Sequence, residues 1–164
     1  MPEITDHHQL QDPPTAPQER SLGAYSLLSG GYVGIFGAAL LAARGRLPER
    51  FATRDLVLAS VATHRLSRLI ARDRVTRPLR APFTEIEAED PPLELRERAR
   101  GEGLRRAFGE LLSCPYCLDQ WIASAFVAGL ALAPRPTRTV VSTFAVVSGA
   151  DYLQHLQRWV RGRT

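Results

Sequence analysis

Two cysteines, Cys114 and Cys117, are the residues of this sequence best suited to chemistry. They stand in the run Ser113-Cys114-Pro115-Tyr116-Cys117, directly before a long apolar stretch that predicts a helix. A thiol at a helix N-terminus faces unpaired N–H groups and the positive end of the helix dipole, which stabilise a thiolate. Pro115 suits the first helical turn, where its missing N–H costs nothing. The local chemistry therefore fits a redox-active dithiol.

Three interpretations of this pair remain open. A redox site would resemble the membrane thiol oxidases, which are helical bundles with a CxxC at a helix end, but it needs a second cysteine pair or a partner protein. The sequence has 2 cysteines in all. A metal half-site needs two further ligands, from a second copy of the chain or from His64. In the third interpretation, which we favour, the cysteines are small packing residues at a tight helix entry. No cofactor or metal is predicted.

A basic helix face is the second feature that could bind a ligand. Residues 55–72 predict a helix on which His64, Arg65, Arg68 and Arg72 fall within about a quarter turn. An arginine at the bilayer centre costs roughly 2.5–3.5 kcal/mol, so the first half of this helix is expected in hydrocarbon and the arginines at the interface. Both a span and a half-inserted amphipathic helix satisfy this condition, and we favour a span. Arg65, Arg68 and Arg72 are therefore candidates for binding lipid headgroups.

The first apolar segment, residues 25–43, carries small residues at a four-residue spacing. Gly30, Gly34 and Ala38 share one helix face. In lipid, such a face lets another helix approach closely. We expect it to pack inside the protein, and a homodimer interface is the second possibility.

The elements that position these residues follow from hydropathy. The mean hydropathy of -0.14 is that of a soluble protein, but the apolar residues are concentrated in four segments. The sequence predicts an all-α membrane bundle of about four short spans, at 25–43, 55–72, 117–133 and 138–154, within a helical domain 25–161. Residues 1–24, with their prolines and acidic residues, are expected to be a disordered tail. Residues 73–113 are expected to be a charged cytoplasmic loop, extended at 77–83 because each proline disfavours helix before it, with a short exposed helix within 93–106.

The charges indicate a membrane location and an orientation. The net charge is +4, all 21 basic residues are arginine, and they flank the apolar segments. We therefore expect contact with membrane lipids and no binding to nucleic acid. In a four-span topology thirteen arginines lie on the side of both termini and six on the other. The positive-inside rule then predicts a multi-pass protein of the bacterial cell membrane with both termini in the cytoplasm.

Two blocks of the sequence resemble a known family. Residues 62–70 with Asp73, Arg80, Pro82 and Phe83, followed by residues 109–118 with Trp121, are similar to an uncharacterised bacterial membrane family, domain of unknown function 1360. The resemblance covers roughly residues 52–153. It implies several membrane spans and no reaction. One departure is Asp119, where the family pattern has glycine, which puts a close-packing role of that position in doubt.

The favoured function is that of an integral membrane protein without a predicted reaction. Its basic helix would contact headgroups, and its loop would offer a surface to a protein partner. The alternative is a membrane thiol-disulfide oxidoreductase that uses Cys114 and Cys117.

Overall fold

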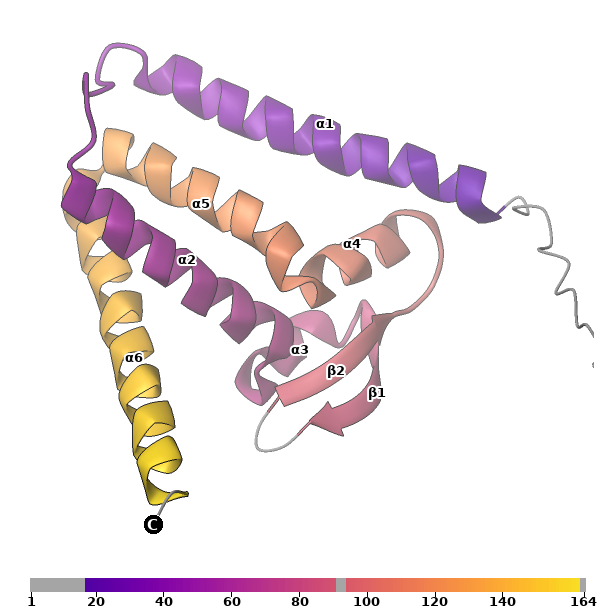
Figure 1. The fold of residues 1–164 in the computed structure, drawn as a ribbon. Coiled ribbons are helices and arrows are strands. Elements are labelled where there is room, and N and C mark those ends of the chain that lie inside the picture. The colour runs from indigo at the N-terminus through magenta and orange to yellow at the C-terminus, as the bar shows by residue number, and fades with distance from the viewer. Residues whose placement is uncertain (1–16, 91–93, 163–164) are drawn as a thin grey trace, which may run out of the picture.

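The computed structural model describes residues 17–90 and 94–162, and it is mostly helical with one small sheet (Figure 1). The elements are α1 (Pro17–Ala43), α2 (Thr53–Arg72), the 3₁₀ turn η1 (Arg74–Thr76), α3 (Arg77–Arg80), β1 (Thr84–Asp90), β2 (Glu94–Ala99), α4 (Gly103–Ser113), α5 (Pro115–Leu132) and α6 (Pro134–Arg161). α2, α5 and α6 pack together, and α1 lies against α4 and α5. The four long helices confirm the predicted helical segments, whereas the sheet means that the fold is not all-α.

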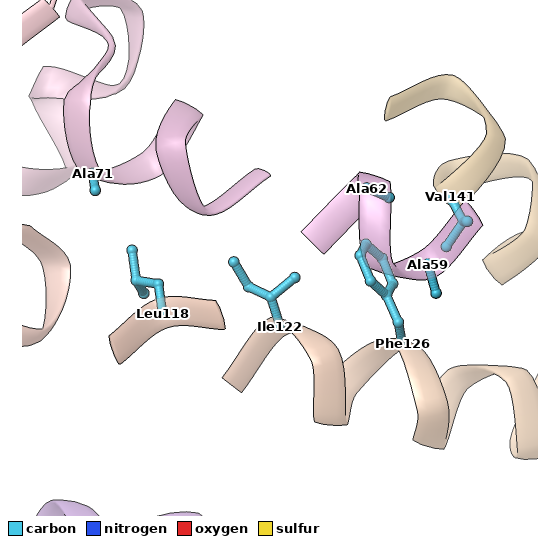
Figure 2. Packing of buried hydrophobic residues seen from close by; sticks show 7 residues of the cluster. All are labelled: Ala59, Ala62, Ala71, Leu118, Ile122, Phe126 and Val141. Atoms are coloured by element: carbon cyan, nitrogen blue, oxygen red, sulfur yellow. The ribbon is translucent and has the colours of Figure 1, made fainter. Parts of the chain in front are cut away.

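The core lies where α2 and α5 meet, with one side chain from α6. Small residues of α2, among them Ala59, Ala62 and Ala71, face larger ones of α5 (Figure 2). Phe126 lies beside Ala59 and Ala62, whereas Leu118 lies toward Ala71 at the other end of the pair. Alanines allow the two helix backbones to approach closely, so the larger side chains fill the space between them.

The prediction of four spans is not supported. Among the described residues, one helix is long and apolar enough to cross a membrane, namely Leu22–Ala43 within α1. The stretches without an acidic or basic residue in α2, α5 and α6 are 56–63, 120–132 and 139–150. Each is shorter than the roughly 20 residues that a full span needs.

The start of α1 differs from the prediction. The helix begins at Pro17 and not at residue 25, so the last part of the predicted tail is helical. The rest of that tail, residues 1–16, lies outside the described residues.

The segment 73–113, predicted as a loop, is folded. The expectation of an extended chain at 77–83 is wrong for α3, because Pro78 stands at the start of that helix, where proline is tolerated. The exposed helix expected within 93–106 is also wrong. Its first part is strand β2, which pairs antiparallel with β1 from Thr84 opposite Ala99 to Asp90 opposite Glu94, with an irregularity between Ile86 and Ala88.

The acidic residues of β1 do not predict a strand, because acidic residues are depleted in sheets. Cross-strand pairing compensates for this: Arg98 of β2 donates to Glu85 of β1 at 2.7 Å. Leu95 and Glu97 are buried on the other face of the hairpin. The hairpin therefore has an outer charged face and an inner face that packs on α4 and α2.

One buried arginine attaches this hairpin to α2. The Arg80 side chain is fully buried and lies 3.0 Å from a carboxylate oxygen of Glu97, which is buried with it. Arg80 also donates to the carbonyls of Ile70 and Asp73 and to the hydroxyl of Thr76. Its guanidinium thus joins the end of α2, the η1 turn and β2.

Burial raises the pKa of the Glu97 carboxyl, but hydrogen bonds from Arg80 and Thr84 and the charge of Arg80 outweigh it, so the pKa lies below its ordinary value. A carboxyl with a lowered pKa stabilises the fold at neutral pH and loses this effect as the pH falls through the folded-state value.

We expect Glu97→Gln to lower the Tm at pH 7, because removing one partner of a buried ion pair typically costs about 3–5 kcal/mol. The Tm difference from the natural protein should shrink as the pH falls below about 4.3, the ordinary pKa of a glutamate. Glu85→Gln removes the same charge from an exposed pair on the neighbouring strand and should change the Tm little. Equal Tm losses in the two variants at pH 7 would contradict a structural role for the buried pair.

A second prediction concerns the contact between α4 and the hairpin. A Cβ atom at Gly109 would lie 2.5 Å from the backbone oxygen of Phe83 and 2.9 Å from the Cβ of Ala99. Gly109→Ala should therefore destabilise the protein by about 1–3 kcal/mol, measured as a lower Tm. Gly149→Ala, in α6 with no atom within 4 Å of the new Cβ, should leave the Tm unchanged or raise it.

Candidate functional site

The two cysteines lie at the corner between α4 and α5, and they form a disulfide. Cys114 has an extended backbone (φ -106°, ψ 104°) and caps α5, because its Sγ accepts the N–H of Cys117 at 3.2 Å. Pro115 begins the helix, as the sequence predicts. The sulfur atoms therefore lie at the positive end of an 18-residue helix. The Cys114 side chain is half-buried and that of Cys117 is exposed, so a reactant can reach the pair.

A basic pocket lies on one side of Cys114. It has a volume of about 520 Å³, and its wall includes His64, Arg68 and Arg72 of α2, Arg96 of β2 and Asp119 of α5. Among the described residues of its wall there are three guanidinium groups and one carboxylate, so this part of the lining has an excess of positive charge. One oxygen of Asp119 is buried in the structure without a hydrogen bond. This composition suits an anion that several arginines bind together.

The three predicted headgroup arginines separate in the structure. Arg68 and Arg72 line the basic pocket. Arg65 instead lies 3.2 Å from the carboxylate of Asp151 in α6 and 3.5 Å from that of Asp73. Its charge is thus used to join α2 to α6. No sequence pattern indicates Arg96 as a site residue, because the hairpin that brings it to α2 is not predicted from the sequence.

An apolar groove of about 650 Å³ lies on the other side of the disulfide. Its walls are α1, α4 and the start of α5, and both cysteines contribute to them. Aromatic side chains meet here: the Trp121 ring lies edge-on to that of Tyr32, with ring centres 5.2 Å apart. The Tyr32 hydroxyl accepts a hydrogen bond from Gln120 and shares another with Ser124, at 2.6 and 2.7 Å. Cys114 therefore separates a basic pocket from an apolar groove.

The small-residue face of α1 has no partner helix within the described chain. Gly30, Gly34 and Ala38 are exposed, and no atom lies within 4 Å of a Cβ built on either glycine. α1 uses a different face, which includes Tyr32 and Phe36, to contact α5. Packing of the glycine face against a second copy stays a prediction.

The described residues do not support a metal site at the cysteines. Within residues 17–90 and 94–162 no group of three or more His, Cys, Asp or Glu side chains is placed to hold a metal ion. His64 does line the same pocket as Cys114, but the sulfurs are bonded to each other and present no thiolate.

A family model described as "Protein of unknown function (DUF1360)" matches residues 58–157. The chain belongs to this family. It is also similar to "Sporulation protein YjcA" of Bacillus subtilis (strain 168), with 32% identity over 110 residues, which are 65% of this chain and 93% of that protein. No solved structure matches the chain.

The family match covers both walls of the basic pocket and the cysteine corner, and it begins after α1. The residues that line the basic pocket and the apolar groove therefore lie within the matched region, except for those of α1 in the groove. The family description assigns no activity.

The disulfide predicts a definite thiol count. Under denaturing conditions the protein purified without reductant should take up no alkylating reagent, and after reduction it should take up two equivalents, as measured by intact mass. Two equivalents of label before reduction would show that the pair is not oxidised.

Proposed function

We propose that this chain is a bacterial membrane protein that uses its basic pocket to bind the phosphate of anionic lipids. The observation that carries the proposal is the pocket of Arg68, Arg72 and Arg96 beside the N-terminus of α5. Guanidinium groups bind phosphate through paired hydrogen bonds, and the positive end of the α5 helix dipole adds a favourable potential for an anion.

Membrane attachment is supported first by α1. Its segment Leu22–Ala43 has the length and hydropathy of a span, and Leu27, Val33 and Leu41 are each more than three-fifths exposed. A helix that leaves large apolar side chains on most of its surface gains stability when lipid, not water, surrounds it.

The other long helices support the same location. The stretches 56–63, 120–132 and 139–150, which carry no acidic or basic residue, lie at one end of the α2–α5–α6 unit, near the connection between α5 and α6 (Figure 1). Val146 and Leu56 are exposed there. The longest of these stretches extends for about 20 Å at 1.5 Å per residue, less than the roughly 30 Å hydrocarbon core. In the proposal these apolar ends enter lipid beside α1 and the flanking arginines extend to the headgroups.

This arrangement places the basic pocket at the boundary of the apolar layer. Asp119 directly precedes the uncharged stretch of α5, and Arg68 and Arg72 lie five and nine residues after the end of the uncharged stretch of α2. The opposite boundary is formed by Arg138, which donates to Asp55 at 2.8 Å. A lipid phosphate at the first boundary would then lie at the level of the pocket. The multi-pass topology and the cytoplasmic termini belong to this proposal.

Binding of anionic lipid is tested by thermal unfolding of the full-length protein in a neutral detergent. Added phosphatidylglycerol should raise the Tm more than phosphatidylcholine does, because only a bound ligand with affinity for the native state stabilises it. The double variant Arg68→Gln/Arg72→Gln should lose at least half of this difference. Arg46→Gln/Arg50→Gln, the same charge change in the exposed connection between α1 and α2, should retain it.

Two further experiments test whether the ligand is a lipid and whether the protein is in the membrane. Inorganic phosphate should stabilise the protein less than the lipid does, and an equal effect would assign the pocket to a soluble anion. After expression in bacteria, the protein should stay in the membrane pellet through an alkaline carbonate wash. Release into the supernatant, or equal lipid responses of the two double variants, would refute the proposal.

A second candidate function is thiol-disulfide exchange, which the Cys114–Cys117 disulfide favours.

A further inference from the structure

We infer that the apolar groove beside the disulfide binds a lipid-soluble quinone, which oxidises the reduced Cys114–Cys117 pair. The inference deepens the second candidate function and shares with the first the location of α1 in lipid. It does not depend on the basic pocket.

The position of the disulfide supports this inference. Both cysteines line the groove, so an occupant of the groove lies next to the S–S bond. Formation of that bond from two thiols releases two electrons and two protons. The sequence has no third cysteine, so the acceptor is not another disulfide of this chain.

The lining of the groove selects the class of acceptor. Leu28, Val33 and Leu111 provide apolar contacts, and Tyr25, Tyr32 and Trp121 provide aromatic ones. The volume of about 650 Å³ falls within the range of small-molecule sites, roughly 300–1,000 Å³. One wall is α1, the helix with the properties of a membrane span. A planar, apolar acceptor that dissolves in lipid fits these walls, and quinones are acceptors of this kind that take up two electrons.

Polar groups at the edge of the groove can bind the quinone oxygens. Gln120 and Tyr32 form a hydrogen bond to each other at 2.6 Å and both line the groove. Either group can turn its donor toward a carbonyl oxygen. Glu110 also lines the groove and pairs with Arg106 at 2.9 Å. Its carboxylate is a possible acceptor for a thiol proton.

The reaction balances with these components. The thiolate of Cys114, stabilised by the helix N-terminus, and the thiol of Cys117 together give two electrons to the quinone. The S–S bond forms and the S–H bond of Cys117 breaks. The two carbonyl oxygens of the quinone gain this proton and the proton that Cys114 gave up when it became the thiolate. The products are the disulfide and one quinol.

Quinone binding can be measured by tryptophan fluorescence, separately from electron transfer. The sequence has 2 tryptophans, Trp121 in the groove and Trp159 in α6. Trp159→Phe leaves Trp121 as the reporter, and Trp121→Phe leaves Trp159 as its matched control. Decylubiquinone added to the full-length protein in detergent should quench Trp121 fluorescence to saturation. Trp159 should show only the linear quenching that quinone dissolved in the detergent causes. Indistinguishable quenching of the two would overturn the groove assignment.

Filling the groove should weaken binding. In the Trp159→Phe background, Ser29→Phe adds a ring to the groove wall and should raise the half-saturating quinone concentration at least tenfold. Ser26→Phe makes the same change at an exposed position of α1 that does not line the groove, and it should bind like its parent. Equal binding by both variants would contradict the inference.

Electron transfer is measured with the reduced protein under anaerobic conditions. One quinol should form and two thiols disappear per protein, at least tenfold faster than with dithiothreitol at the same thiol concentration. Cys114→Ser/Cys117→Ser should still quench with quinone but form no quinol. Thiols that stay reduced in saturating quinone would refute the redox step, whatever the result of the lipid-binding experiment.

Discussion

The buried ion pair between Arg80 and Glu97 is the interaction on which the polar end of the molecule depends. Charges removed from water lose several kcal/mol of hydration. Arg80 offsets this loss with hydrogen bonds to Glu97, to Thr76 and to the carbonyls of Ile70 and Asp73. Arg80 reaches the end of α2, the η1 turn and β2 at once. Within the described residues no other buried charge of the hairpin joins it to α2, so this connection helps to hold Arg96 beside Arg68 and Arg72. The basic pocket therefore depends on a side chain that does not line it.

The cysteine corner depends in turn on the packing around α4. Gly109 allows α4 to lie directly on the backbone of Phe83, and α4 ends four residues later, at its junction with α5. Cys114 occupies that junction, and its sulfur caps α5. The same residue borders both the basic pocket and the apolar groove. Reduction or oxidation of the Cys114–Cys117 pair would therefore change the lining of both the basic pocket and the apolar groove.

The charged residues show which features a local pattern can predict and which it cannot. Arg65, Arg68 and Arg72 share a helix face, as the 3.6-residue period requires, but the period does not identify their partners. Asp151 lies 86 positions further along the sequence than Arg65 and pairs with it because α6 packs on α2. The β-hairpin was missed for a related reason. Its strands are rich in acidic and basic residues, and their pairing is stabilised by contacts to Arg80 and α4 that no local pattern contains.

The sequence by itself determined the four long helices, the helix start at Pro115 and the family, because hydrophobic periodicity, proline geometry and two compact motifs are local properties. It also identified the cysteine pair and the basic face of α2. Only the tertiary structure decided that the segment 73–113 is folded, that Arg96 and Asp119 join Arg68 and Arg72, and that Tyr32 and Trp121 border the cysteines. These relations arise where elements distant in the chain pack together, and such packing depends on the shapes and charges of both surfaces.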